Sequence, residues 1–233
     1  MSNCAMRVRL QLEEKKIPWV DRFVDLRAQK NLTEEYFKIH PKGLVPAIIH
    51  DGTIVYESSD ILVYIEEKFP ETPLIPSDPA KKAEMQYWLN WFSVNHLPVI
   101  KTWAYGRNNK PTKTKESMAV YETLQKDQEL LDFHRMTLSE GAIPEEKILK
   151  AQDLLFEAFS KVDKNLATSE YVLGDKVSLA DIAWIPQYPL LMRNDFPFEK
   201  FPNYLAWIER WKKRPSYKEA ISKWVAEWVP GAV

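Results

Sequence analysis

The chain is poor in the residues and patterns that mark several specialised classes of protein. It holds a single cysteine, Cys4, which excludes an internal disulfide and favours a reducing compartment. Its 32 Lys+Arg and 33 Asp+Glu are spread over both halves, which argues against nucleic acid or an anionic membrane as a partner. No apolar run could span a bilayer, and the residues after Met1 are not a secretory signal. We therefore expect a cytoplasmic protein.

Motifs for nucleotide, metal or serine-hydrolase chemistry are also missing. Only 6 glycines occur, and none are spaced as a dinucleotide fingerprint or a phosphate-binding loop. The 4 histidines are far apart, and none stands at metal-ligand spacing from a cysteine or carboxylate. The G-x-S-x-G elbow of many hydrolases is absent. We therefore expect no metal and no nucleotide as cofactor.

The most informative stretch covers residues 44–69. Two short runs of apolar and β-branched residues flank Asp51-Gly52 and predict a β-hairpin. A proline at the mouth of a strand cannot donate a ladder hydrogen bond, so Pro46 marks a special backbone position and a candidate cis peptide bond. Glu57-Ser58 follows the second run and opens a capped helix with apolar residues at helical spacing.

The residues before this hairpin predict a helix, a strand and a second helix. The first helix begins near the start of the chain, with Ser2 or Asn3 as its N-cap. Residues 19–24 have the composition of a strand, and residues 32–39 that of a short helix. One strand plus a hairpin makes a thin sheet. We therefore expect that a strand which normally precedes Ser2 is missing from this chain.

The rest of the chain predicts a helical domain behind a linker. Four prolines between residues 70 and 79, without any periodic pattern, are typical of a linker. We predict an N-terminal domain over residues 1–70, a linker over 71–79 and a helical domain over 80–233. The helices expected in that domain cover residues 80–104, bent at Pro98, residues 116–135, the segments that follow Pro144 and Ser178, and residues 202–213 and 216–228.

Several short motifs together resemble those of the glutathione S-transferases. They are Ser2-Asn3-Cys4, His40-Pro41-Lys42-Gly43-Leu44-Val45-Pro46, Glu57-Ser58, Ser178-Leu179-Ala180-Asp181, and Phe201-Pro202 with Arg214-Pro215. The resemblance covers nearly the whole chain and is to serine-type members, theta-like or zeta-like. The length of the stretch 108–143 looks more like bacterial relatives around the β-aryl-etherase branch. The resemblance implies an α/β thioredoxin-like domain, here without its central first strand, followed by an all-α domain.

The resemblance also implies that glutathione is the co-substrate and Ser2 the catalytic residue. From the N-terminus of the first helix, the Ser2 hydroxyl would donate a hydrogen bond to the glutathione sulfur, where both effects favour a thiolate. The alternative is that Ser2 is a plain helix cap. Cys4 is a candidate for a thiol role, because a cysteine recurs near the site in related subgroups. The alternative for Cys4 is a small buried residue.

The hairpin stretch carries the other glutathione contacts that the resemblance implies. The backbone of Val45, ahead of the bend at Pro46, would pair with the extended peptide as in strand addition. Glu57 would bind the ammonium group, and Ser58 with the free N–H groups of its helix would bind the γ-glutamyl carboxylate. The alternative for Glu57-Ser58 is a simple helix cap.

One departure from the family pattern concerns the glycine end of glutathione. Leu44 stands where related enzymes often have Gln or Lys reaching that end of the peptide. We expect Lys42 or Lys30 to take over the contact.

Six residues of the predicted helical domain could have either a structural or a functional role. Ser178 and Asp181 form an S-x-x-D pattern and are most simply a buried helix cap with a structural role. Four aromatic residues are candidates for lining the pocket of the electrophilic acceptor: Trp103, Tyr105, Trp184 and Trp228. The alternative for each is core packing, because most tryptophans serve that purpose.

We predict a glutathione S-transferase that activates the glutathione thiol for attack on a small hydrophobic or aromatic electrophile, in detoxification or β-aryl ether cleavage. Two alternatives stay open. One is a zeta-like cis–trans isomerase that uses glutathione as a cofactor, and the other is a non-catalytic member kept for binding or assembly. The resemblance further implies a homodimer.

Overall fold

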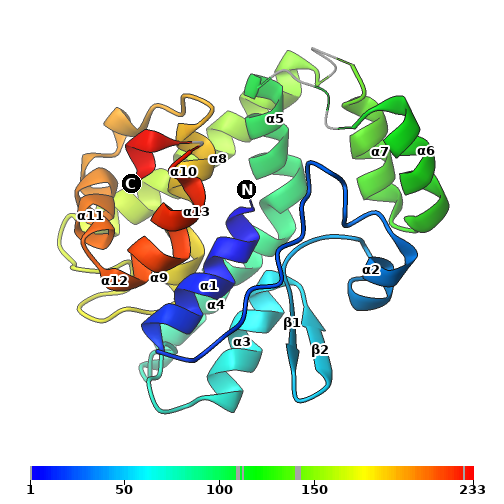
Figure 1. The fold of residues 1–233 in the computed structure, drawn as a ribbon. Helices are drawn as coiled ribbons and strands as arrows, with labels where there is room; N and C mark the ends of the chain where they lie inside the picture. Colours follow the sequence, from blue (N-terminus) through cyan, green and yellow to red (C-terminus); the bar gives the residue numbers. More distant parts are fainter. Residues whose placement is uncertain (1, 109–110, 112, 140–142, 228) are drawn as a thin grey trace.

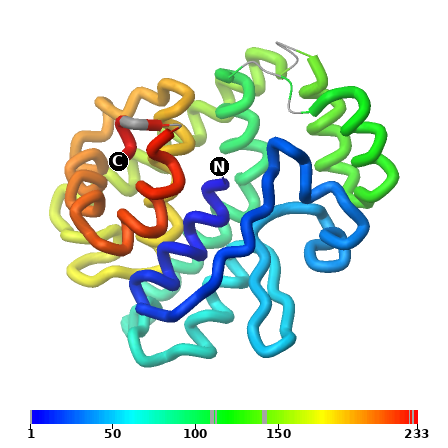
Figure 2. Tube along the Cα trace, viewed as in Figure 1, coloured from blue at the N-terminus to red at the C-terminus, as the bar shows by residue number. Residues whose placement is uncertain are grey.

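The chain folds into a small N-terminal unit and a larger helical one, which lie side by side (Figures 1 and 2). The computed structural model describes residues 2–108, 111, 113–139, 143–227 and 229–233. The N-terminal unit contains α1 (Asn3–Glu14), α2 (Glu34–Ile39), β1 (Ala47–His50), β2 (Thr53–Tyr56) and α3 (Ser58–Lys68). No helix in the described part of the chain combines the length and the apolar character that a membrane crossing needs.

The predicted hairpin is present and forms a two-stranded antiparallel sheet. Ile48 pairs with Val55, and Asp51 and Gly52 turn the chain with φ values of 49° and 79°. Both values lie in the left-handed region, which the D-G pair tolerates and which matches the twist of a tight hairpin. The peptide bond between Val45 and Pro46 is cis, as the sequence suggested.

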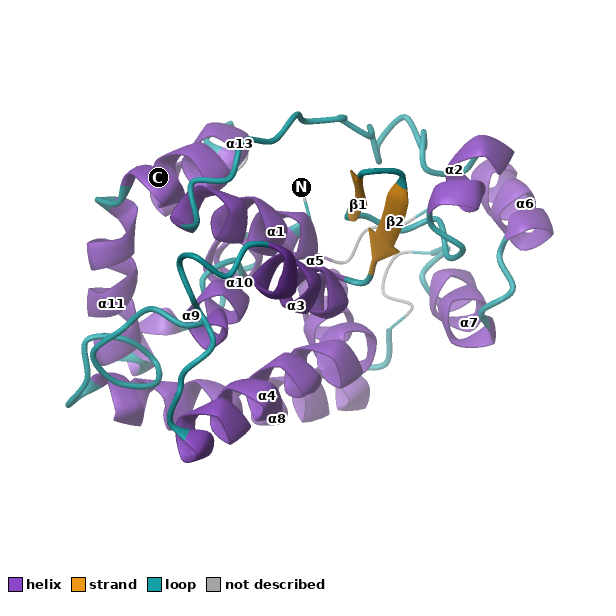
Figure 3. Ribbon diagram, turned by 90° about the horizontal axis from the view of Figure 1, so that it is seen from below, coloured by secondary structure: helices purple, strands orange, loops and turns teal. Residues whose placement is uncertain are grey.

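One face of the hairpin packs against two helices. Ile48 and Val55 contact a cluster of Val8 from α1 with Ile61 and Ile65 from α3, all three of them buried. The helix α2 lies on the other side of the hairpin, next to two helices of the helical unit, α6 and α7 (Figure 3). The hairpin therefore stands between the first helix and the α2 region.

The strand predicted over residues 19–24 is wrong. The segment is extended but pairs with no strand, and Val20 and Phe23 are 78% and 71% exposed. A strand is stable only when another strand shares its backbone hydrogen bonds. The two strands of the hairpin pair with each other, and the described residues contain no third strand next to this segment. β-Branched composition alone was therefore not enough to form a strand.

The helical unit begins directly after the proline-rich segment. Its longer helices are α4 (Pro79–Asn95), α5 (Thr102–Asn108), α6 (Lys115–Leu124), α7 (Gln128–Met136), α8 (Glu145–Leu166), α9 (Leu179–Trp184), α10 (Gln187–Met192) and α11 (Pro202–Lys212). Short helical segments close the chain over Phe198–Lys200, Pro215–Tyr217 (α12), Lys218–Ser222, Lys223–Val225 (α13) and Pro230–Ala232. The expected bend at Pro98 is a π-helical segment, His96–Lys101, between α4 and α5.

The single helix expected over residues 116–135 is instead a helical hairpin. The helix is interrupted before Asp127, which begins a new one. The Asp127 carboxylate accepts a hydrogen bond from the Leu130 backbone N–H at 3.2 Å and so caps α7. The Gln125 side chain accepts hydrogen bonds from the backbone N–H groups of Lys126 and Asp127 and holds the turn. Weak helical periodicity in this stretch thus reflects two short helices.

The core of the helical unit is aromatic and encloses the predicted cap. The Trp184 ring lies 4.9 to 5.0 Å from the rings of Trp88, Phe92 and Phe159. Ser178 and Asp181 form a capping box at the start of α9, as the S-x-x-D pattern predicts. The buried Asp181 carboxylate also accepts the Val172 backbone N–H at 2.9 Å. Burial raises the pKa of Asp181 to about 6.

Candidate functional site

The N-terminus of α1 presents a serine with a free hydroxyl proton. Ser2 is the N-cap, and its Oγ accepts a hydrogen bond from the Ala5 backbone N–H at 3.2 Å. A hydroxyl that accepts one hydrogen bond still has its own proton to donate. The helix cap and the sulfur donor proposed for Ser2 are therefore compatible roles of one side chain.

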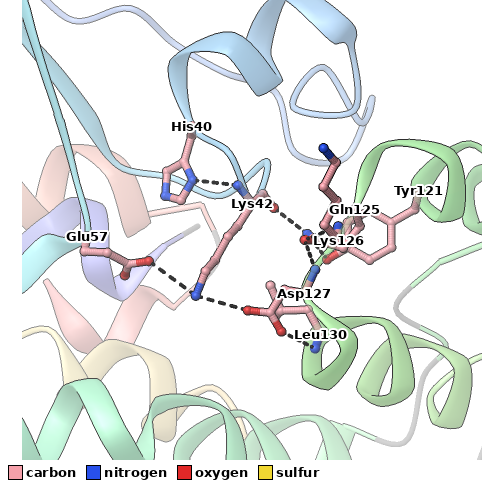
Figure 4. Close-up of polar contacts among 8 residues, drawn as sticks. All are labelled: His40, Lys42, Glu57, Tyr121, Gln125, Lys126, Asp127 and Leu130. Carbon is pink, nitrogen blue, oxygen red and sulfur yellow. Dashed lines mark hydrogen bonds and ion pairs between the residues drawn. The ribbon is translucent and has the colours of Figure 1, made fainter.

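The N-terminus of α3 is a second group of unpaired backbone donors. Ser58 is its first residue and is buried, and the preceding Glu57 makes no side-chain capping hydrogen bond. The N–H groups of the first turn therefore lack an intrahelical partner. Glu57 has a φ of 65°, a strained value for a residue other than glycine, of the kind that gathers at ligand sites. Its carboxylate is half-exposed and points toward Lys42 (Figure 4).

The cysteine on α1 lies beside a histidine that sequence reasoning did not connect with it. Cys4 Sγ is 3.6 Å from Nε2 of His96, which stands at the start of the π-helical segment. Burial lowers the pKa of His96 well below its ordinary value, so the ring is neutral near pH 7. The two residues are 92 positions apart, and no local pattern in the sequence links them.

A buried arginine connects α1 with the start of α3. Nη1 of Arg7 donates a hydrogen bond to Ser58 Oγ at 3.4 Å, and the guanidinium lies 4.5 Å above the ring of Phe92. Its Nε and Nη2 atoms are buried and have no hydrogen-bond partner among the described residues. Sequence reasoning missed this residue, and its only signal was a charged residue among the apolar positions of α1.

Lys42 is already engaged by carboxylates on both sides of the site (Figure 4). Its Nζ lies 3.1 Å from Asp127 Oδ2 and 3.9 Å from Glu57 Oε1. The backbone carbonyl of Lys42 accepts a hydrogen bond from Gln125 Nε2 at 2.8 Å. The hydrogen bond to Asp127 raises the pKa of Lys42. The α6–α7 hairpin thus contacts the loop that precedes Val45-Pro46.

The residue that departs from the family pattern has a packing role. Leu44 packs with Phe37 against a cluster shared by the N-terminal unit and the α6–α7 hairpin, made of Leu32, Met118, Tyr121, Leu130 and Leu131. An apolar side chain at position 44 therefore helps to anchor the hairpin.

Two of the four aromatic residues assigned to an acceptor pocket lie in the core. Trp184 and Trp103 are 0% and 1% exposed, so neither has surface to offer to a ligand. Both fill the interior of the helical unit because their rings pack against other aromatic rings. Tyr105 is half-buried, with its ring 5.8 Å from that of Phe133, and stays a candidate. Trp228 lies outside the described residues.

Among the described residues, no group of three or more His, Cys, Asp and Glu side chains is arranged to hold a metal ion. The start of α3 carries two acids, Glu57 and Asp60, and the Glu57 carboxylate faces Lys42. The other polar groups at the starts of α1 and α3 are donors and cations: two helix N-termini, two serine hydroxyls and Arg7, which donates a hydrogen bond to Ser58. Such an arrangement binds anions.

Comparisons with known proteins identify the family. Residues 1–68 match the model of the glutathione S-transferase N-terminal domain, and residues 114–215 match that of the C-terminal domain. The chain therefore belongs to the glutathione S-transferase family. The family, the two-part fold and the assignment as a glutathione transferase enzyme that the sequence predicted are confirmed.

Individual relatives cover most of the chain. Protein LigF of Sphingobium sp. SYK-6 is 30% identical over 91% of this chain and 86% of its own length. The crystal structure of the β-etherase LigF from that organism superposes with a TM-score of 0.83 and 27% identity, covering 94% of this chain and 95% of that one. A zeta-class glutathione S-transferase of Euphorbia esula is 28% identical over 94% of this chain and 86% of its own length.

Proposed function

We propose that this protein binds glutathione at the paired N-termini of α1 and α3 and transfers its thiolate to an aromatic electrophile. The observation that carries the proposal is that Ser2 and Ser58 each stand at a helix N-terminus, and that Arg7, on the same helix as Ser2, donates a hydrogen bond to Ser58. Helix N-termini favour anions, and glutathione brings two of them to such a site, a thiolate and a carboxylate.

The residues have distinct roles in this proposal. Ser2 donates its free proton to the glutathione sulfur, and the backbone of Val45, next to the cis bond at Pro46, pairs with the peptide. Ser58 and the first N–H groups of α3 bind the γ-glutamyl carboxylate, and the half-exposed Glu57 binds the ammonium group. Lys42 contacts the glycine end while it stays paired with Asp127.

The acceptor that we propose is a β-aryl ether or a related hydrophobic electrophile. The support is the similarity to the β-etherase LigF of Sphingobium sp. SYK-6. In this reaction the thiolate attacks the carbon that bears the aryl oxygen, a C–S bond forms and the C–O bond breaks. The electron pair leaves with the aryl oxygen, which takes a proton from solvent. Ser2 keeps the attacking sulfur ionised until the bond forms.

A comparison of three proteins tests the assignment of Ser2. Wild type, Ser2→Ala and Ser2→Thr are assayed for glutathione binding by calorimetry and for conjugation of an aryl ether. We expect Ser2→Ala to lose about 100-fold in kcat, in the range measured for loss of a donor to a developing anion, and Ser2→Thr to retain most of the activity. Equal rates for wild type and Ser2→Ala would refute the role of Ser2. Absence of glutathione binding by the wild type would refute the proposed function.

We also propose a cytoplasmic homodimer. Exposed apolar residues on α4 and on the hairpin, Tyr87, Val94 and Ile49, support a contact with a second copy. Light scattering at micromolar concentration should give twice the 27.3 kDa mass of one chain.

A further inference from the structure

The helix α1 carries a buried positive charge that has no negative partner. Arg7 is 1% exposed, and none of the ion pairs between described residues includes it. Its contacts are one hydrogen bond to Ser58 Oγ and the face of the Phe92 ring. Two of its nitrogen atoms, Nε and Nη2, have no partner in the described part of the chain. A guanidinium in such surroundings is expensive to bury.

The same helix shows that this fold can neutralise a buried cation. Lys15, at the other end of α1, is 8% exposed, and its Nζ lies 2.8 Å from Glu66 Oε1 and 2.6 Å from the Thr72 carbonyl oxygen. Arg7 has no comparable partner. A bound anion would supply the counter-charge that the described residues do not.

The position of Arg7 identifies the kind of ligand. It lies one turn after Cys4 on α1 and contacts the first residue of α3 through Ser58. The other titratable groups near Arg7 are Cys4 and His96, with the Lys101 charge acting on the histidine, and burial keeps His96 neutral near pH 7. Both helix N-termini and Arg7 therefore carry the same sign. Two acids stand at the start of α3, but Glu57 faces Lys42 at 3.9 Å and Asp60 is exposed, and no ion pair between described residues joins either of them to Arg7.

We propose that Arg7 is a positioning residue for glutathione, and that it orients Ser58 and supplies the buried positive charge that keeps the bound thiol ionised. The inference rests on the proposed function. The charge of Arg7 acts on the sulfur through a low-dielectric interior, where it is weakly screened. Upon binding, the glutathione thiol loses its proton to solvent, and the resulting thiolate compensates the guanidinium.

The test measures the pKa of the thiol of bound glutathione. A Cys4→Ser parent removes the protein's own thiol, and the thiolate absorbance near 240 nm is titrated from pH 5 to pH 9 with glutathione bound. Arg7→Met removes the charge, while Arg7→Lys keeps a charge but not the fork of donors. Arg9→Met is the matched control, because Arg9 stands two residues away and contacts Asp21 at 3.1 Å and the Trp224 ring at 3.6 Å instead.

We expect the thiol pKa to rise by about one unit in Arg7→Met, which corresponds to about a tenfold loss of thiolate at pH values well below the thiol pKa, with Arg7→Lys in between and Arg9→Met unchanged. An unchanged thiol pKa in a folded Arg7→Met protein would overturn the inference. If Arg7→Met does not fold, Arg7→Gln and Arg7→Lys replace it, and equal thiol pKa values in those two would overturn it. A parent that binds no glutathione would instead refute the proposed function.

Discussion

The two ends of α1 treat buried charge in opposite ways. At the C-terminal end, Lys15 pairs with Glu66, which also accepts hydrogen bonds from Gln11 Nε2 at 3.1 Å and from the Leu74 backbone N–H at 2.9 Å. At the N-terminal end, Arg7 keeps two nitrogen atoms unpaired among the described residues. The pairing of Lys15 with Glu66 joins α1 to α3 and to the segment after it. The Arg7 guanidinium, in contrast, keeps a positive charge without an acidic partner among the residues that the structure describes.

A second satisfied network at the C-terminal end ties α1 to the last helices. The Glu14 carboxylate accepts hydrogen bonds from Arg214 Nη2 at 2.6 Å and Nε at 3.0 Å, and from the Ser216 hydroxyl. Bidentate pairs of this kind define geometry as well as adding energy. One helix can therefore contribute to stability at its C-terminal end, where the charges are paired. At its N-terminal end, where Arg7 has no acidic partner among the described residues, the same helix can serve ligand binding.

The largest effect is expected from breaking the paired end. Glu66→Gln leaves the Lys15 charge buried without a counter-ion, which should lower the free energy of unfolding by about 3–5 kcal/mol. Urea denaturation measures the loss. The double variant Lys15→Met/Glu66→Leu should recover most of it, because no isolated charge remains. Glu157→Gln, in an exposed pair with Lys161, is the control and should change the unfolding free energy by less than about 0.5 kcal/mol. A Glu66→Gln effect as small as that of the control would contradict the comparison.

Acid should lower the free energy of unfolding through His96, which contacts Cys4 near the N-terminus of α1. Burial lowers the pKa of His96, so below about pH 6.5 the unfolded chain binds a proton that the folded chain refuses. Stability is then lost as pH falls, by up to about 1.4 kcal/mol per pH unit for each such histidine. His96→Gln should remove this part of the slope between pH 6.5 and pH 5, measured as thermal or urea unfolding at each pH.

The histidine at position 40 contributes to the same slope and is left unchanged in that measurement. Burial and the Lys42 charge lower the pKa of His40 to about 4, so its contribution to acid sensitivity ends near that pH. A chain with His40 intact and His96 replaced should therefore keep only the part of the slope that His40 and the buried His134 provide. Parallel stability curves for wild type and His96→Gln would count against the assignment.

Removing the unpaired charge itself should cost little stability. Without ligand, Arg7→Met loses the 3.4 Å hydrogen bond to Ser58, which is unfavourable, but it also removes an uncompensated buried charge, which is favourable. Methionine still fills the space against Phe92. We expect an unfolding free energy within about 1 kcal/mol of the wild type. Lys15→Met, with Glu66 left unpaired, should be clearly less stable. Equal losses in the two variants would show that both ends of α1 serve stability alike.

The smallest effect is expected at Lys42. The side chains of Lys42 and Glu57 are nearly half-exposed and that of Asp127 is 25% exposed, and exposed pairs contribute about 0.2–1 kcal/mol. Lys42→Met should therefore raise KM for glutathione by less than about fivefold, with kcat unchanged, in steady-state kinetics. Lys38→Met, on α2, is the control. A larger increase in KM would mean that Lys42 leaves Asp127 to bind the glycine carboxylate directly.

The sequence allowed prediction of features that depend on local chemistry. Asp51-Gly52 predicts the hairpin because its residues accept positive φ, and the structure has both residues there. Ser178 and Asp181 predict a capping box because their spacing alone brings the groups together. Ser2 predicts an N-cap for the same reason. The family motifs then implied where glutathione binds.

Features that depend on distant residues could not be predicted in this way. Residues 19–24 have strand composition but pair with no strand, and whether a strand forms depends on its neighbour. Trp184 looked like a pocket residue, yet its burial depends on rings from α4 and α8. The ion pair of Lys42 with Asp127 and the contact of Cys4 with His96 join residues that are far apart in the chain.

The sequence by itself therefore determined the hairpin, the capped starts of α1 and α9, and the family to which the chain belongs, because turns, caps and short motifs act between close neighbours. Only the tertiary structure decided which charges are paired. Arg7 lies within α1 and Lys15 is the C-cap of that helix, and the local sequence does not tell which of the two has an acidic partner. Their difference arises because folding places Glu66 beside Lys15 and the first turn of α3 beside Arg7.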